Sequence, residues 1–74
     1  MAERGASRLP RRLRELRKEK KETQAQVAAA TGMAYRQYQR FEAGEQKPGF
    51  DNFCALADHF GVSLDYLAGR SDVR

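Results

Sequence analysis

The sequence has little of what small proteins commonly use to reinforce a weak core. Its 74 residues include one cysteine, one histidine and no tryptophan. A single thiol excludes an intramolecular disulfide, and one His with one Cys excludes a zinc site of the usual composition. We therefore expect no metal, no cofactor and one compact domain that is stabilised by helix packing or by dimerisation.

Long hydrophobic runs and β-branched residues are also scarce. No stretch approaches the roughly 18 to 20 apolar residues that span a bilayer, and the N-terminus lacks the apolar core of a signal peptide. The chain has three valines and no isoleucine, and alternating apolar patterns are missing. These absences predict an all-α, soluble, cytoplasmic protein that does not contact a membrane.

Charge is present but unevenly distributed. The net charge is +4, yet residues 1–21 hold nine Lys or Arg against three Glu, whereas residues 49–74 hold two Arg against four Asp. Such asymmetry favours a polyanionic partner, and we expect nucleic acid rather than an anionic membrane surface, because the apolar stripe of the first predicted helix holds only three leucines and no aromatic residue. A basic helix face that is merely solvated explains the same charge equally well.

Glycine and proline divide the chain into a compact bundle of five short predicted helices. Thr23 and Ser63 are predicted N-caps, and proline at position 10 suits a first helical turn. The predicted helices span, in order, residues 10–20, 24–31, 34–43, 50–60 and 64–68. Residues 1–8 are predicted to be a flexible basic N-terminal arm, 9–69 the folded domain and 70–74 a frayed C-terminal tail.

Apolar residues at helical spacing give the predicted core. Its members are Leu9, Leu13, Leu16, Val27, Ala28, Met33, Tyr38, Phe41, Phe50, Phe53, Cys54, Leu56, Ala57 and Phe60. Tyr66 and Leu67, near the end of the chain, either form a dimer contact or complete the core of the monomer. His59 lies beside core residues, so we expect a partly buried or exposed histidine rather than a metal ligand.

The segment from Gln24 to Ala43 carries the functional prediction. It comprises a helix, a tight turn and a second helix within twenty residues, the length of a DNA-reading helix-turn-helix unit. Ala28 is small enough for two helices to cross closely, and Gly32 can adopt a positive φ in the turn. The chain has no nucleophile paired with a base and no phosphate-binding loop, so we expect neither enzymatic activity nor a small-molecule ligand.

An ordered set of short motifs extends this prediction over residues 9–69. Its members are Leu16-Arg17, Thr23-Gln24, Val27-Ala28, Gly32, Phe41-Glu42-Ala43-Gly44, Lys47-Pro48, Leu56-Ala57, Phe60-Gly61-Val62-Ser63 and Leu67. In this set the sequence resembles the Cro and lambda-repressor-like regulators, the Xre family of helix-turn-helix proteins. Three positions depart from the pattern of that family: Glu22 replaces a common leucine, Thr31 a common aliphatic residue and Ala34 a common Ser or Thr cap.

The resemblance implies a role for each polar residue of the motif. The third helix would lie in the major groove of double-stranded DNA, where each base pair presents a distinct pattern of donors and acceptors. The residues implied to contact bases are Tyr35, Arg36, Gln39 and Arg40. Those implied to contact phosphates are Gln24, Gln37, Gln46 and Lys47. Arg17 and Glu42 correspond to a buried structural salt bridge, and ordinary solvation is the alternative for the remaining side chains.

The predicted function is sequence-specific DNA binding as a transcriptional regulator, in particular a repressor. A homodimer formed through the fourth and fifth helices would bind a palindromic operator with half-sites roughly 34 Å apart. The alternative is a protein-interaction module, such as an antitoxin-like subunit that binds a partner protein. The arginines before and within the first helix either supplement DNA binding or form a solvated surface: Arg8, Arg11, Arg12 and Arg14.

Overall fold

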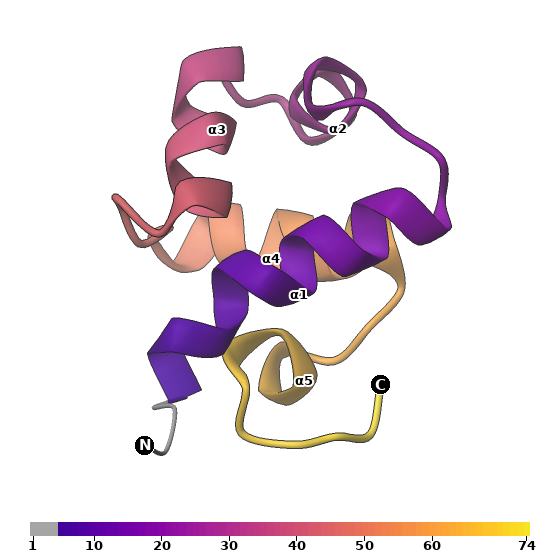
Figure 1. The fold of residues 1–74 in the computed structure, drawn as a ribbon, viewed down its shortest axis with the longest axis vertical. Helices are drawn as coiled ribbons and strands as arrows, with labels where there is room; N and C mark the ends of the chain where they lie inside the picture. Colours follow the sequence, from indigo (N-terminus) through magenta and orange to yellow (C-terminus); the bar gives the residue numbers. More distant parts are fainter. Residues whose placement is uncertain (1–4) are drawn as a thin grey trace.

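The computed structural model describes the backbone of residues 5–74 and the side chains of residues 8–74. This part of the chain forms five helices: α1 (Gly5–Glu19), α2 (Gln24–Thr31), α3 (Tyr35–Ala43), α4 (Phe50–Phe60) and α5 (Leu64–Ala68). In Figure 1, α1 crosses the middle of the molecule, with α2 and α3 above it, α5 below it and α4 behind. The predicted all-α class with five short helices is confirmed.

The start of α1 differs from the prediction, which placed it near Pro10. The helix begins at Gly5 and contains Pro10 in its interior. Leu9 is buried, and Arg8 donates from Nη1 to the carbonyl of Gly69 at 3.3 Å. These contacts with the end of α5 stabilise the helix before the proline. Residues 5–8 are thus helical, and residues 1–4 of the predicted arm lie outside the described residues.

Thr23 caps the start of α2 as predicted, and Gln26 adds a reciprocal bond that was not predicted. The Thr23 hydroxyl accepts a hydrogen bond from the Gln26 backbone N–H at 3.1 Å, and the Gln26 side-chain oxygen accepts one from the Thr23 N–H at 2.8 Å. This capping box satisfies two donors that a helix start leaves without intrahelical partners. Ser63 caps α5 in the same way, since its hydroxyl accepts from the Tyr66 N–H at 3.0 Å.

The helices end with a common backbone arrangement. At the end of α1, the N–H of Lys21 donates to Lys18 O at 3.0 Å and that of Glu22 donates to Arg17 O at 3.1 Å. The same pair of bonds closes α2 to α5, where the residue in the left-handed conformation is a glycine each time. In α1 that residue is Lys21, with φ 57°, the sole non-glycine residue in the described backbone with a positive φ.

All five helices contribute to the core. The largest fully buried side chains are Tyr38, Phe41, Leu13, Leu56, Leu67 and Val27. Tyr66 and Leu67 are 7% and 0% exposed within a single chain, so they complete the core of the monomer. Phe50 was predicted to be buried, but it is 72% exposed at the first residue of α4, and Cys54 is only partly buried.

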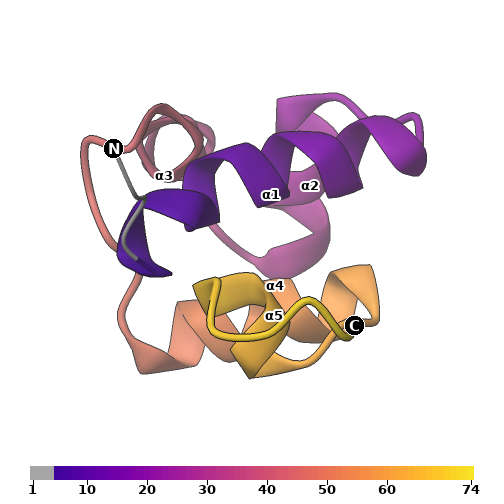
Figure 2. The same cartoon turned by 60° about the horizontal axis from the view of Figure 1, so that its bottom comes forward.

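The C-terminal tail runs beside α5 (Figure 2), and side-chain contacts connect it to α1, contrary to the predicted frayed end. Arg12 donates to the carbonyls of Tyr66 and Ser71, the latter at 2.7 Å, and to Asp72 Oδ1 at 2.8 Å. Arg74 forms two hydrogen bonds with the carboxylate of Glu19, at 2.8 and 2.7 Å. We call these residues the tail network: Arg12, Glu19, Tyr66, Asp72 and Arg74. Within residues 5–74, none of the helices is long and apolar enough to cross a membrane.

Candidate DNA interface

Helices α2 and α3 form a rigid pair at one end of the molecule (Figure 1). The turn between them depends on Gly32, which has a φ of 74° and closes α2 with the adjacent Met33 N–H donating to Ala28 O at 2.9 Å. Ala28 is 2% exposed, so its small side chain lies within the core. This backbone fixes the orientation of α3 relative to α2.

A buried carboxylate connects the helix pair to α1. Arg17 contacts Glu42 through Nε to Oε2 at 2.6 Å and Nη2 to Oε1 at 3.1 Å. Tyr38 donates its hydroxyl to Oε2 at 2.6 Å, and Gln24 donates Nε2 to Oε1 at 3.0 Å. We call Arg17, Gln24, Tyr38 and Glu42 the Glu42 cluster. The ion pair that the sequence implied is therefore present, and the carboxylate is bonded on both oxygens.

The protonation state of the Glu42 cluster follows from these contacts. Burial alone would raise the pKa of Glu42, but hydrogen bonds from Arg17, Tyr38 and Gln24 outweigh it and hold that pKa below its usual value. The bond to Glu42 raises the pKa of Arg17, and burial together with the Glu42 contact raises the pKa of Tyr38. At neutral pH the cluster holds an ionised pair and a neutral phenol.

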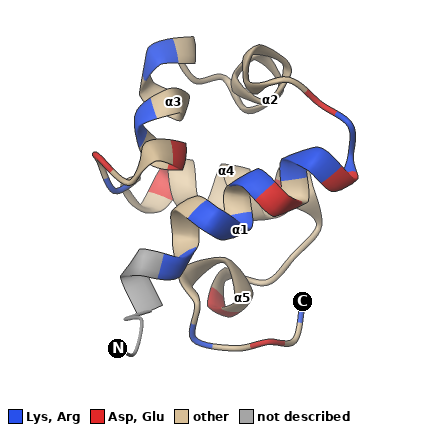
Figure 3. Cartoon of the chain, in the orientation of Figure 1, with Lys and Arg blue, Asp and Glu red and all other residues tan. Residues whose placement is uncertain are grey.

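The outer face of α3 carries the residues predicted to contact bases. Tyr35 is 51% exposed, and Arg36 and Arg40 are exposed, while Gln39 is partly buried. Gln39 donates from Nε2 to the side-chain oxygen of Gln24 at 3.4 Å. Figure 3 shows two basic bands on α3, whereas α2 carries no charged residue. The structure thus brings together on α3 two exposed guanidinium groups, one exposed phenol and one partly buried amide, which we call the polar row.

The residues predicted to contact phosphates surround this row. Gln24 begins α2 and joins α3 through its two hydrogen bonds, and Gln37 lies partly buried in the first turn of α3. Gln46 and Lys47 are exposed in the segment between α3 and α4. The N-cap residue of α3 is Ala34, which has no hydroxyl and makes no side-chain hydrogen bond to the N–H groups of the first turn.

Two of the arginines in α1 have structural contacts that sequence reasoning missed. Arg12 belongs to the tail network and is 9% exposed, with its guanidinium 4.0 Å from the centre of the Tyr66 ring. The suggestion that Arg12 supplements DNA binding is therefore wrong. Arg14 donates from Nη1 to the carbonyl of Glu42 at 2.7 Å, near the end of α3. Both contacts join residues at least 28 positions apart, so local patterns could not reveal them.

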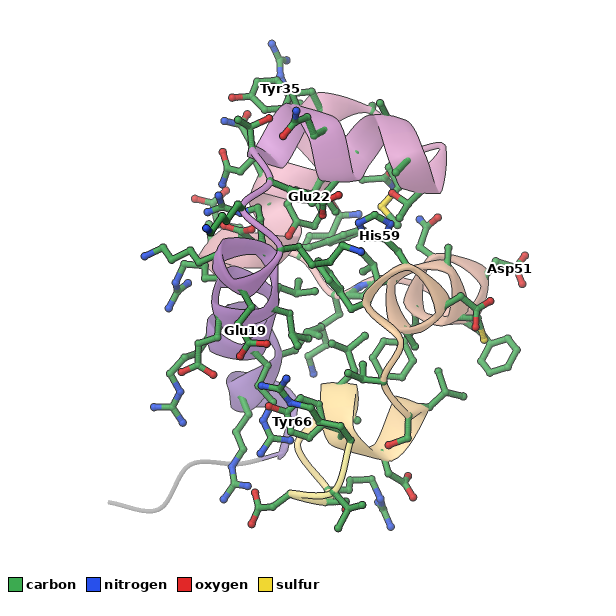
Figure 4. All side chains as sticks on the ribbon, turned by 90° about the vertical axis from the view of Figure 1, so that its right-hand side faces the viewer. Glu19, Glu22, Tyr35, Asp51, His59 and Tyr66 are labelled. Atoms are coloured by element: carbon green, nitrogen blue, oxygen red, sulfur yellow. The ribbon has the colours of Figure 1, made fainter. Side chains whose placement is uncertain are left out.

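The structure explains two of the three departures from the family pattern. Glu22 Oε1 lies 2.8 Å from His59 Nε2, and Figure 4 shows the two side chains facing each other between α1 and α4. The Thr31 hydroxyl donates to Val27 O at 2.8 Å within α2, so its polar group is satisfied. A polar residue at position 22 thus has a partner where the family commonly has leucine.

The described residues contain no cluster of three or more His, Cys, Asp or Glu that could hold a metal.

Comparison with known proteins identifies the fold family. The sequence profile of HTH_3, described as helix-turn-helix, matches residues 13–67. The chain belongs to the HTH_3 family. This is the Cro/C1-type, or Xre, family of helix-turn-helix transcriptional regulators, so the predicted family, lambda-repressor-like fold and non-enzymatic class are confirmed. The matched range includes the whole of α2, α3 and α4 and part of α1 and of α5.

Two curated relatives illustrate the similarity of this HTH_3 chain. It is 43% identical over 61 residues to an uncharacterised HTH-type transcriptional regulator, YobD, of Bacillus subtilis, covering 82% of this chain and 54% of the relative. It is 39% identical over 59 residues to the cryptic phage CTXphi transcriptional repressor RstR of Vibrio cholerae, covering 80% and 53%. The chain therefore spans about half the length of the curated relatives it matches.

Proposed function

We propose that this protein is a sequence-specific transcriptional repressor that inserts α3 into the major groove of double-stranded DNA. The exposed polar row on α3, fixed in place by the buried Glu42 cluster, carries this proposal. A rigid recognition helix is required because each base contact depends on a side chain that reaches the correct edge. RstR, named as a transcriptional repressor, supports repression rather than activation.

Each residue of the row has a chemistry suited to a base. Arg36 and Arg40 offer planar guanidinium groups that can donate two bonds to guanine O6 and N7. Gln39 can form a similar pair with adenine, and its contact with Gln24 limits the orientations of its amide. Tyr35, which is 51% exposed, can contact a thymine methyl group or a phosphate. These four residues would determine which sequence is read.

Phosphate contacts on both sides of α3 would set its position in the groove. Gln24 lies at the start of α2 and Gln37 near the start of α3, where backbone N–H groups favour anions. Gln46 and Lys47 would contact the backbone from the segment after α3. Such contacts add affinity and fix the register but do not discriminate between sequences.

We further propose a homodimer formed through α4 and α5 on a palindromic operator. Phe50 of α4 and Leu64 of α5 are 72% and 38% exposed, so each of these two helices has an apolar side chain that a second copy could cover. Two copies would present their α3 helices to half-sites roughly 34 Å apart. Sedimentation of the protein with and without Phe50→Ser tests this directly, and a wild-type monomer on its operator would contradict it.

The main test is selection from random duplex DNA at about 150 mM salt, where weak phosphate attraction is suppressed. We expect one palindromic sequence to be recovered, and Arg36→Ala and Arg40→Ala to relax the preference at particular positions by about 1–3 kcal/mol each. Arg70→Ala is the matched control, because Arg70 is 77% exposed and lies just after α5, outside the α2–α3 unit.

Other outcomes separate the alternatives. Binding that depends strongly on salt but not on sequence would exclude specific recognition by this chain alone. In that case a protein-interaction role, such as an antitoxin-like subunit, becomes the better proposal. An equal loss of selectivity in Arg70→Ala and Arg36→Ala would contradict the assignment of α3 as the reading helix.

A further inference from the structure

Helix α1 presents two flanks that face different parts of the molecule. Arg17 and Arg14 both extend toward Glu42 at the end of α3, at 2.6 Å to its carboxylate and 2.7 Å to its carbonyl. Arg12 extends instead toward the tail, where it contacts Ser71 and Asp72. These contacts define which side of α1 adjoins the recognition helix.

Three basic residues lie on α1 and in the turn that follows it, starting at Arg14, which contacts the end of α3. Residues four positions apart lie next to each other on a helix surface, as Arg14 and Lys18 do on α1, and Lys21 follows in the turn that ends this helix. All three side chains are exposed. We call them the basic ridge: Arg14, Lys18 and Lys21. Glu15 borders this ridge, whereas Glu19 lies on the other flank, bonded to Arg74.

The ammonium groups of Lys18 and Lys21 are not bound by other side chains of the described residues. Neither Lys18 nor Lys21 has a side-chain hydrogen bond or an ion pair among residues 8–74, whereas the adjacent Lys20 donates to His59 O at 3.4 Å. Lys21 also holds the left-handed position that glycine occupies at the ends of the other four helices. A lysine therefore occupies a position whose backbone conformation favours glycine.

The position of the ridge indicates its partner. Lys21 precedes by three residues Gln24, which begins α2 and bonds both Glu42 and Gln39. The ridge thus begins at Arg14, which contacts the end of α3, and ends three residues before the start of α2. The apolar stripe of α1, which contains Leu13 and Leu16, is buried in the core, so α1 has no apolar side to insert into a membrane.

We propose that Arg14, Lys18 and Lys21 form a second phosphate-binding surface, which contacts the DNA backbone beside the half-site that α3 reads. This inference rests on the proposed function, because it requires α3 to lie in the groove. Contacts to phosphates release condensed counterions, and each adds about 0.9 to the steepness of the dependence of log K on log salt concentration. The ridge would supply affinity that does not depend on base sequence.

The experiment compares two charge-matched double variants. Lys18→Gln with Lys21→Gln removes two charges from the basic ridge. Lys20→Gln with Arg70→Gln removes two charges elsewhere, since Lys20 faces His59 and Arg70 lies after α5. Fluorescence anisotropy with a random-sequence duplex of about 25 base pairs, long enough for two half-sites, gives the affinity over a series of salt concentrations.

We expect the slope of log K against log salt concentration to be less steep by about 2 in the ridge variant. The control variant should keep the slope of the wild-type protein. The selected base sequence should be the same in both variants. Circular dichroism melting would verify that both are folded. Equal salt dependences in the two variants would overturn the ridge while leaving recognition by α3 intact. Absence of binding by the wild-type protein to any duplex would overturn both the ridge and the proposed function.

Discussion

The Glu42 cluster and the tail network join opposite flanks of α1 to the rest of the protein, and both depend on arginine, but they differ in burial. The carboxylate of Glu42 is 3% exposed, whereas that of Asp72 is 88% exposed. The ion pair of Arg74 and Glu19 is also half exposed, at 48% and 51%. Water can therefore replace the protein partners of one network but not of the other.

This difference determines how much each network contributes to stability. A buried charge that loses its partner remains unsolvated, so breaking such a pair costs about 3–5 kcal/mol. An exposed pair is hydrated before and after it is broken, and its contribution is commonly below about 1 kcal/mol. The protein thus has a strong connection between α1 and the helix-turn-helix, and a weaker one between α1 and the tail.

The largest effect is expected from Glu42→Ala. This change leaves the guanidinium of Arg17 and the hydroxyl of Tyr38 without their partner, so we expect the free energy of unfolding to fall by about 3–5 kcal/mol. Thermal melting followed by circular dichroism measures the change as a drop in Tm of more than about 10 °C.

The matched control for Glu42→Ala is Glu45→Ala. Glu45 is exposed in the segment after α3, so the same truncation there should leave Tm nearly unchanged. Similar losses from the two substitutions would show that the Glu42 cluster does not carry the stability that its burial implies.

Acidification should weaken the two networks unequally. The pKa of Glu42 lies below its ordinary value of 4.5, so its contribution to stability is fully present above pH 4.5 and is lost as the pH falls through the lower pKa of the folded state. The bond from Arg74 lowers the pKa of Glu19 in the same direction, but solvent screens that exposed pair. Unfolding by urea between about pH 5 and pH 3 should show a steep loss that Glu42→Gln reduces and Glu19→Gln does not. An undiminished loss in Glu42→Gln would assign the acid sensitivity to other carboxylates.

An intermediate effect is expected from Arg12→Ala, because Arg12 is buried although its partners are mostly not. It would remove charge-assisted bonds to two carbonyls and the contact with the Tyr66 ring, at a cost of about 2 kcal/mol. Arg12→Lys keeps the charge but not the planar fork, so it should recover only part of the loss in Tm. Full recovery by lysine would mean that charge alone holds the tail.

The smallest effect is expected from Glu19→Gln. The pair with Arg74 is exposed, so Tm should remain within the error of the measurement. Hydrogen exchange provides the finer readout, because the Ser63 N–H donates to Arg74 O at 2.8 Å and should exchange faster when the tail loosens. Unchanged exchange at Ser63 would indicate that Arg12 alone keeps the tail in place.

The helix boundaries after residue 20 could be predicted because they depend on local chemistry. Thr23 and Ser63 cap their own helices, and glycine marks each of the ends after α1. The start of α1 could not be predicted in this way, since the turn before Pro10 is stabilised by contact with Gly69, which is distant in sequence. The position of the tail depends in the same way on Arg12.

The candidate interface was predictable in its residue types but not in its geometry. Helical spacing placed Tyr38 inside and Arg36 outside α3, as observed. The same spacing predicted that Phe50 is buried, but this residue is 72% exposed. Periodicity shows which side of a helix faces the core, but it does not show how far along the helix axis the neighbouring helices extend. The distinction between Arg12 and Arg14 required the three-dimensional arrangement, since both belong to one basic run.

At Lys21 the backbone conformation and the proposed phosphate contact favour different residues. A glycine there would relieve the backbone, as it does at the ends of the other helices, but would remove an ammonium group from the basic ridge. Protein engineers who seek a more heat-resistant form of this domain would select glycine at position 21. Those who seek higher affinity for DNA would keep the lysine. The choice of residue at position 21 therefore exchanges thermal stability against the proposed phosphate contact.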